Sequence, residues 1–224
     1  MRVLQIALVL IVCVISGCNE NTHSGTPYDH TSSLTAIRDR DFLHGISPEA
    51  SGQLVNTVIE IPAGSNAKWE VNKETGHLEW EVRGDSLRVI RYLPYPANYG
   101  MVPQSLMPAS EGGDDDPLDV FVLGPRAKTG SIIRTRVIGV LYMKDDGEQD
   151  DKLIAVDTDS WFGNIETLEA LNANFPGITN ILSTWLANYK GPGADVELMG
   201  TGDEAEAAAI LARGISAYRI VREQ

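Results

Sequence analysis

The chain has 224 residues, of which 43% are apolar and 22% are charged, a composition that is typical of a globular protein and excludes disordered and collagen-like chains. Acidic residues outnumber basic ones by 31 to 18, which gives a formal net charge of -13. This excess argues against broad electrostatic attraction to nucleic acid or to anionic lipid. The two cysteines, Cys13 and Cys18, are too few and too close together to staple a fold.

The N-terminus has the pattern of a lipoprotein signal peptide. After the basic residue Arg2, apolar residues run almost without interruption from Val3 to Ile15, a stretch clearly shorter than the roughly 20 residues that span a bilayer. The run ends at Ser16-Gly17-Cys18, which resembles a bacterial lipobox, where the cysteine is lipidated and becomes the new N-terminus. The sequence therefore predicts a signal peptide over residues 1–17, a lipid on Cys18, and anchorage in the cell envelope, on the periplasmic or outer-membrane side of a Gram-negative bacterium.

The rest of the chain divides into a lead-in and one domain. Residues 18–53 are rich in Ser, Thr, Gly, His and Asp without clear periodicity, which predicts a lipidated tether and a loosely ordered lead-in. Residues 54–224 are expected to form a single domain. Its strand signals are short alternating or apolar runs at 57–61, 68–71, 77–82, 118–123, 131–143 and 152–156.

Helices are expected late in the chain. Apolar residues at i, i+3, i+4, i+7 and i+8 from Ile178 predict a helix that starts near Pro176 and stops before Gly191. A second helix is predicted from about Asp203 to Arg222, with acidic residues in its first turn and arginines near its end. The pattern indicates a barrel of short strands with packed helices.

Two windows, Glu111–Asp119 and Asp145–Asp151, together carry a charge of -10 against the net -13 of the chain, because each has five carboxylates and no Lys or Arg. Such windows form solvated loops or bind cations, and hard divalent ions such as Mg²⁺ prefer oxygen ligands. The first window leads directly into an apolar strand, which would hold its carboxylates in place. It is not a calcium-binding EF-hand, because the sixth and twelfth positions hold Asp119 and Pro125 in place of Gly and Glu.

The segment Asp114-Asp115-Asp116-Pro117-Leu118-Asp119 resembles the Asp-x-Asp-Pro-x-Asp signature of family I soluble inorganic pyrophosphatases. Further motifs in the same order extend the resemblance from about Val58 to Tyr218, and Asp145–Lys152 matches the spacing Asp-x4-Asp-x-Lys. The resemblance implies an α+β, mainly β fold, a five-stranded OB-like β-barrel with packed helices. It also implies hydrolysis of inorganic pyrophosphate to two orthophosphates with several Mg²⁺ ions, or with Mn²⁺ or another divalent ion.

Carried over residue by residue, the resemblance implies three groups of site residues. The metal-binding positions are Glu60, Asp114, Asp119, Asp145 and Asp150, and the phosphate-binding positions are Lys68, Arg88, Lys152, Tyr189 and Lys190. The positions closest to the chemistry are Asp116, which matches the carboxylate that takes a proton from the attacking water, together with Tyr95 and Arg88, while Glu70 and Tyr99 lie beside the site. Arg91 is close enough in sequence to be confused with Arg88.

Each motif taken by itself also has a purely structural interpretation. The aspartates of both windows could form turns, and Glu60, Lys68 and Glu70 could be the polar face of edge strands. Two other functions are also compatible with a barrel. A surface cation binder that has lost catalysis could dispense with the basic residues of the site, and a barrel for oligosaccharide or nucleic acid should show exposed aromatics among basic residues. The presence of all the basic residues favours an enzyme, with direct attack by water and no covalent intermediate. A homo-oligomer is compatible with the resemblance, and no nucleic-acid partner is expected.

Overall fold

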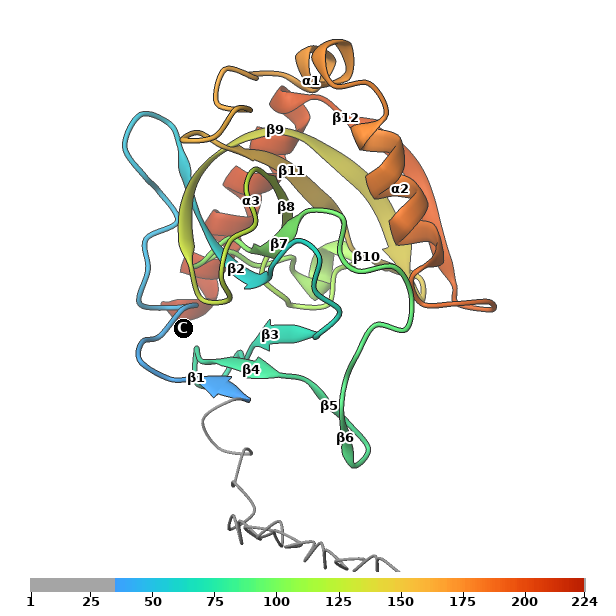
Figure 1. Ribbon diagram of the computed structural model, residues 1–224. Helices are drawn as coiled ribbons and strands as arrows, with labels where there is room; N and C mark the ends of the chain where they lie inside the picture. Colours follow the sequence, from blue (N-terminus) through green and yellow to red (C-terminus); the bar gives the residue numbers. More distant parts are fainter. Residues whose placement is uncertain (1–34, 224) are drawn as a thin grey trace, which may run out of the picture.

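The computed structural model describes residues 35–223, and the predicted signal peptide and Cys18 lie outside them (Figure 1). Five strands close into a ring in the order β9-β11-β8-β7-β2, because β2 pairs with both β7 and β9. Their bounds are β2 Val55–Ile61, β7 Asn98–Met101, β8 Asp119–Leu123, β9 Ile132–Asp145 and β11 Lys152–Asp157. The ring confirms the predicted five-stranded barrel in a mainly β chain.

Smaller elements extend this ring. Strands β10 (Glu148–Gln149) and β12 (Val196–Gly202) pair with β9, and β1 (Ala36–Ile37), β4 (Leu78–Trp80) and β3 (Trp69–Val71) form a separate sheet. Strands β5 (Val82–Arg83) and β6 (Ser86–Leu87) form an exposed hairpin, and a 3₁₀ turn occupies Ala109–Glu111. The helices are α1 (Leu168–Asn174), α2 (Ile178–Asn188) and α3 (Glu204–Arg222). No helix within residues 35–223 has the length and apolar character needed to cross a bilayer.

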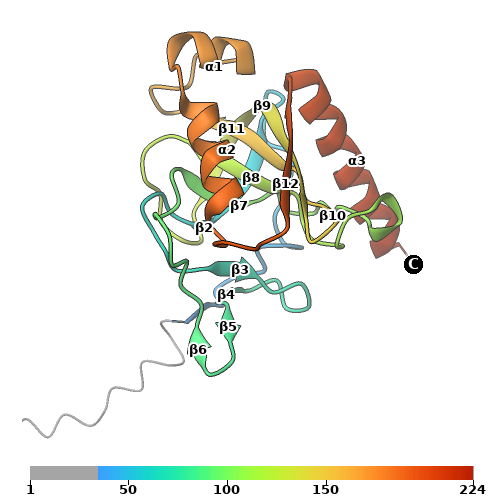
Figure 2. The same cartoon turned by 90° about the vertical axis from the view of Figure 1, so that its right-hand side faces the viewer.

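The central strand β8 is buried on both of its faces. Phe121 belongs to a core cluster that includes Trp185 of α2, whereas Val120 and Val122 belong to a second cluster that includes Ile210 of α3. Successive side chains of a strand point to opposite faces, so this single apolar run supplies both clusters. The two helices accordingly lie on opposite sides of the strands (Figure 2), and β8 is held rigidly between them.

Both predicted helices are present. In α2, Leu182, Trp185 and Leu186 are buried, but Ile181 is 58% exposed, so the apolar face is narrower than its sequence period suggests. Helix α3 starts at a capping box, in which Asp203 accepts hydrogen bonds from the first turn and Glu206 accepts one from the backbone of Asp203.

The structure differs from the predicted loosely ordered lead-in over residues 35–53. Strand β1 pairs with β4, and Phe42 and Leu43 are almost fully buried beside Val58 of β2. The backbone there is fixed by Asp41, whose carboxylate accepts hydrogen bonds from the amides of Leu43 and His44. Burial of two apolar side chains orders a segment that lacks any sequence period.

Candidate active site

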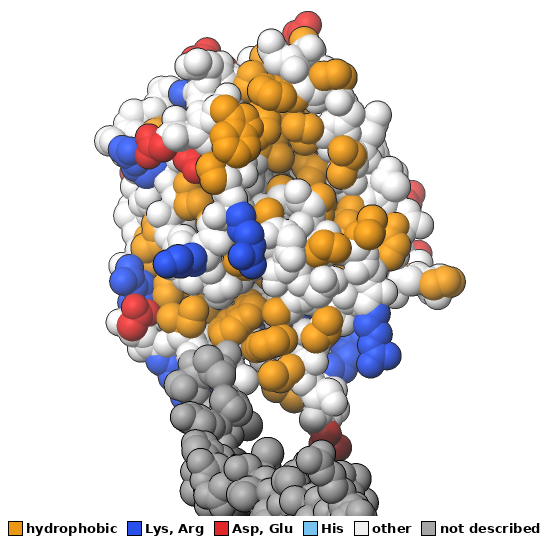
Figure 3. All heavy atoms as spheres, in the orientation of Figure 1, with side chains coloured by type: hydrophobic (Ala, Val, Ile, Leu, Met, Phe, Trp, Pro, Cys, Tyr) orange, Lys and Arg blue, Asp and Glu red, His pale blue; other side chains and the backbone are white. Residues whose placement is uncertain are grey.

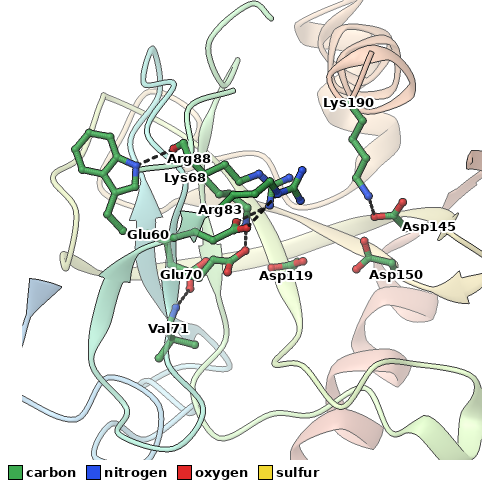
Figure 4. A network of polar contacts seen from close by, with 12 residues as sticks. Glu60, Lys68, Glu70, Val71, Arg83, Arg88, Asp119, Asp145, Asp150 and Lys190 are labelled. Atoms are coloured by element: carbon green, nitrogen blue, oxygen red, sulfur yellow. Dashed lines mark hydrogen bonds and ion pairs between the residues drawn. The ribbon is translucent and has the colours of Figure 1, made fainter. Parts of the chain in front are cut away.

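Four predicted site residues lie on neighbouring strands of the barrel. Glu60 is on β2, Tyr99 on β7, Asp119 on β8 and Lys152 on β11. In Figure 4, Asp119 lies between a group that contains Glu60, Lys68, Glu70 and Arg88 and a second group that contains Asp145, Asp150 and Lys190. The ring of strands therefore brings together residues that are 92 positions apart along the chain, from Glu60 to Lys152.

Lys152 links two of the acidic residues. It stands opposite Asp119 in the parallel pairing of β11 with β8, and its ammonium contacts the carboxylates of both Asp119 and Asp150. Burial opposes its charge, but the two carboxylates outweigh burial and raise the pKa of the lysine above its usual range. For Asp150, burial raises the pKa of the carboxyl, and this effect outweighs the lowering by Lys152. The lysine is thus held as a buried cation in an acidic pocket.

Glu60 is a buried carboxyl on the floor of the site. Its side chain is almost inaccessible, and its Oε1 accepts a hydrogen bond of 2.7 Å from the amide of Val71. Burial raises the pKa of Glu60 to about 8, although Lys68 acts in the opposite sense. The Lys68 Nζ lies 2.5 Å from Glu70 Oε1. Burial lowers the pKa of Lys68, but the neighbouring acidic groups, with the carboxylate of Glu70 in direct contact, outweigh burial, so that this lysine also stays charged.

The structure distinguishes the two candidate arginines by position. The guanidinium of Arg88 lies 2.5 Å from Glu81 Oε2, and the Arg88 carbonyl accepts a hydrogen bond from the indole of Trp80 at 2.7 Å. Figure 4 shows Arg88 beside Lys68 and above Glu70. Arg91 is exposed and has no hydrogen-bond or ion-pair partner among residues 35–223. The network around Lys68 therefore includes Arg88 and not Arg91.

Three tyrosines form the aromatic side of the site. The rings of Tyr95 and Tyr99 have centroids 5.2 Å apart, and Tyr95 packs against Trp185 of α2 at 4.4 Å. The ring of Tyr189 is also stacked on that of Trp185, with centroids 4.6 Å apart and an interplanar angle of 7°. Burial raises the pKa of each of the three hydroxyls, so all are neutral O–H donors at ordinary pH.

The first acidic window forms a loop that leads into β8. Asp114 Oδ1 accepts a hydrogen bond of 2.9 Å from the amide of Asp116, and Asp115 has a positive φ of 59°. Burial raises the pKa of Asp114 to about 6. The ammonium of Lys73 contacts the carboxylate of Asp116, a partner that the sequence motifs do not indicate.

The second acidic window is contacted by Lys190, which lies just after the end of α2. Lys190 contacts Asp145 Oδ2, whereas Asp145 Oδ1 is buried and has no hydrogen-bond partner within the described part of the chain. Over residues 35–223, no three His, Cys, Asp or Glu side chains gather as a ready-made metal cluster. Lysine ammonium groups lie against the acidic residues Asp116, Asp119, Asp145 and Asp150.

The sequence motifs do not reveal the ion-pair partners of Asp116 and Arg88. Lys73 on the acidic loop, and Glu81 and Arg83 beside Arg88, belong to none of the motifs. Arg83 lies 4.0 Å from the carboxylate of Glu81, which it shares with Arg88. The only sequence signal for them is a charged residue next to a turn, and this signal is common in solvated hairpins.

Residues 57–219 match the family model described as inorganic pyrophosphatase. The chain belongs to this family. It is 37% identical over 176 residues to the inorganic pyrophosphatase of Gluconobacter oxydans (strain 621H), a match that covers 74% of this chain and 91% of the relative.

Solved pyrophosphatase structures have the same fold. The inorganic pyrophosphatase of Helicobacter pylori has 30% sequence identity and a TM-score of 0.65, with 78% of this chain and 98% of that chain covered. The type I inorganic pyrophosphatase of Toxoplasma gondii has 25% identity and a TM-score of 0.76, with 81% and 88% covered. The predicted activity is thereby confirmed: the protein is an inorganic diphosphatase, and it hydrolyses inorganic pyrophosphate.

Proposed function

We propose that this pyrophosphatase works by direct attack of a metal-activated water on pyrophosphate, with several Mg²⁺ ions as cofactor and Mn²⁺ or another divalent ion as the alternative. The observation that carries the proposal is the excess of carboxylate oxygens in a partly buried site. Asp145 Oδ1 is buried without a partner, and burial raises the pKa of Asp114 and Asp150. Both features cost free energy that bound cations would recover.

The donor set fits a hard divalent cation. Carboxylate oxygens are the ligands that Mg²⁺ prefers, and the candidates come from three strands and two loops of the barrel. Those candidates are Glu60, Asp114, Asp119, Asp145 and Asp150. Bound Mg²⁺ would lower the pKa of a coordinated water toward neutrality and neutralise charge on the substrate.

The protein's own groups carry the remaining steps. Asp116 accepts the proton of the attacking water, in a loop whose backbone is fixed by the hydrogen bond to Asp114. Hydrogen-bond donors from different parts of the chain bind the phosphate oxygens: Lys68, Arg88, Lys152, Tyr189 and Lys190. Their N–H and O–H groups stabilise the charge that develops on the leaving phosphate. Because Tyr95 and Tyr99 are buried aromatic residues, they keep bulk water from that side.

A phosphate-release assay tests this proposal. The enzyme should release two orthophosphates per pyrophosphate with Mg²⁺, lose the activity in EDTA and regain it when Mg²⁺ is restored. Asp119→Ala should lose activity while its circular dichroism stays that of the native chain. Activity that persists in EDTA, or in Asp119→Ala, would reject the metal-based mechanism.

We further propose that the enzyme is a lipoprotein of the cell envelope, attached to the membrane through Cys18. The support is the apolar leader followed by a small residue and a cysteine, and the polar segment that comes after it. A homo-oligomer stays a prediction, which sedimentation of the purified protein would test.

A further inference from the structure

Exposed hydrophobic side chains gather on one segment of the molecule. Within residues 35–223, eleven large hydrophobic side chains are exposed, and five of them lie in the twelve residues from Val82 to Leu93. These residues, which include strands β5 and β6, are called the hairpin segment. The five are 39% to 67% exposed: Val82, Leu87, Val89, Tyr92 and Leu93. Single exposed apolar residues are ordinary, but a cluster of them marks a surface that binds a partner.

The hairpin segment holds these side chains outward from a fixed backbone. Strands β5 and β6 pair only with each other, and Val82 stands directly opposite Leu87, so the two side chains share one face of the hairpin. At the end of the segment, the carbonyl of Leu93 accepts a hydrogen bond of 2.9 Å from the indole of Trp185. The segment is therefore tied to α2 while its apolar side chains face solvent.

The hairpin segment is basic, although the chain as a whole is acidic. It contains three arginines and one acidic residue, Asp85, whereas the net charge of the chain is -13. Arg83 and Arg88 share the carboxylate of Glu81. Arg91 is exposed and has no hydrogen-bond or ion-pair partner in the part of the chain that the structure describes. Figure 3 shows Lys and Arg side chains beside hydrophobic ones at the lower end of one face. Arginine together with apolar and aromatic side chains is typical of surfaces that lie in the headgroup region of a bilayer.

The hairpin segment lies where the described chain begins. The carbonyl of Thr35 accepts a hydrogen bond of 2.8 Å from the amide of Trp80, two residues before β5. Figure 1 places β1 and the β5–β6 hairpin at one end of the molecule and helix α1 at the other, and Figure 2 agrees for the hairpin and α1. Cys18 lies 17 positions before Thr35, a stretch that spans at most about 60 Å. A bilayer that holds a lipid on Cys18 is therefore within reach of the hairpin segment.

We propose that the hairpin segment docks on the membrane that holds this anchor, with its apolar side chains in the headgroup region and Arg91 on lipid phosphates. This inference rests on the lipoprotein proposed above. Because the anchor keeps the domain near the bilayer, the effective concentration of lipid is high and a weak contact suffices. The segment also contains Arg88, a proposed phosphate-binding residue, so docking holds the active site close to the lipid surface.

The charge of the hairpin segment favours lipid over a second copy of the chain. A symmetric contact between two copies brings the same patch of each together, so that the arginines of one hairpin meet those of the other. Like charges at such a contact repel. The phosphate groups of a bilayer surface carry the opposite charge and pair with arginine.

A fluorescence experiment on the lipidated, full-length protein tests which end of the domain touches lipid. Once Cys18 is lipidated and the leader is removed, Ser86→Cys supplies one thiol for a fluorophore on the hairpin, and Ala173→Cys supplies one on the exposed side of α1 as the control. The proteins are reconstituted in vesicles of phosphatidylethanolamine and phosphatidylglycerol that contain nitroxide-labelled lipid. Quenching at Ser86→Cys should exceed that at Ala173→Cys at least about threefold, and adding Val82→Ser and Leu87→Ser should remove the difference. Equal quenching at the two positions would overturn the proposal.

Failure of the anchor and failure of docking give different results. If fatty acid does not label Cys18, the anchor is wrong, and flotation of the purified full-length chain with the same vesicles decides the docking surface. The native chain and the control Ile181→Ser, which removes an exposed apolar side chain of α2, should then float at least about threefold more than the Val82→Ser, Leu87→Ser variant. Equal flotation of all three would reject docking.

Sedimentation in detergent tests the other occupant. The native protein and the Val82→Ser, Leu87→Ser variant should have the same oligomeric state and the same pyrophosphatase activity, because neither residue belongs to the proposed site. A native dimer that these two substitutions dissociate, without quenching at Ser86→Cys in vesicles, would make the hairpin segment an interface between copies and exclude the membrane as its partner.

Discussion

Lys152 and Asp119 face each other across the parallel pairing of β11 with β8, and the buried ammonium of Lys152 also contacts Asp150. A lysine that is only 4% exposed is costly to bury unless it is paired. Here it balances two carboxylates that would otherwise repel each other. In the proposed mechanism the same ammonium donates hydrogen bonds to the phosphate oxygens of the substrate. Both stability and catalysis therefore depend on the charge of Lys152.

Lys152→Met should therefore destabilise the metal-free protein by about 3 kcal/mol, because it leaves the partly buried carboxylates of Asp119 and Asp150 without a partner. Urea unfolding in EDTA measures this change, and Mg²⁺ should restore part of the loss by binding the freed carboxylates. The matched control is Lys128→Met, which removes an exposed lysine and should change stability by less than about 0.5 kcal/mol. Equal stability of the two variants would contradict the role of Lys152.

Glu60 should make the metal-free protein less stable as the pH rises. Its pKa is about 8 in the folded protein and near 4.5 in an unfolded chain, so the folded state holds the proton over the range between them. The free energy of unfolding should then fall from about pH 5 to pH 8. Glu60→Gln has no titrating group at this position, so its urea midpoint in EDTA should fall less over the same range. Identical slopes for the two proteins would contradict the buried, protonated state of Glu60.

Close packing of the backbone leaves no room for a side chain at Gly100. A Cβ at this position would lie 1.9 Å from the carbonyl oxygen of Val58, where β7 pairs with β2. Gly100→Ala should push these strands apart and destabilise the protein by about 1–3 kcal/mol. Because Tyr99 and Glu60 lie on the same two strands, pyrophosphatase activity should fall as well. A thermal midpoint equal to that of the native protein would show that the strands absorb the extra methyl group.

The lipid anchor is tested by labelling cells with a radioactive fatty acid. The native chain and Cys13→Ser should both incorporate label, whereas Cys18→Ser should not, because only Cys18 remains after cleavage of the predicted leader. Undiminished labelling of Cys18→Ser would exclude the anchor.

The sequence predicts the barrel well where strands are long and apolar. The run from Val120 to Leu123 is buried on both faces, and its composition alone indicates this. Strands β7 and β12 were not predicted: β7 spans only four residues and contains Gly100, and β12 contains Gly200 and Gly202 and is half exposed. Helix α1 has seven residues, too few for a clear period.

The site residues that belong to a sequence motif could be predicted. The acidic loop and the Asp145–Asp151 window stand out in the sequence because carboxylates gather there without lysine or arginine. Their partners could not be found in the same way. Lys73 contacts Asp116 from 43 positions away, and the choice between Arg88 and Arg91 depends on the fold of the β5–β6 hairpin.

In the proposed mechanism, Asp116 accepts the proton of the attacking water in a metal-dependent pyrophosphatase. The most direct measurement is Mg²⁺-dependent phosphate release from pyrophosphate by Asp116→Asn, beside Asp159→Asn, which neutralises an exposed aspartate paired with Arg134. We expect kcat of Asp116→Asn to fall by at least about 100-fold with the fold intact, and kcat of the control to be unchanged. Near-native kcat in a folded Asp116→Asn protein would contradict this mechanism.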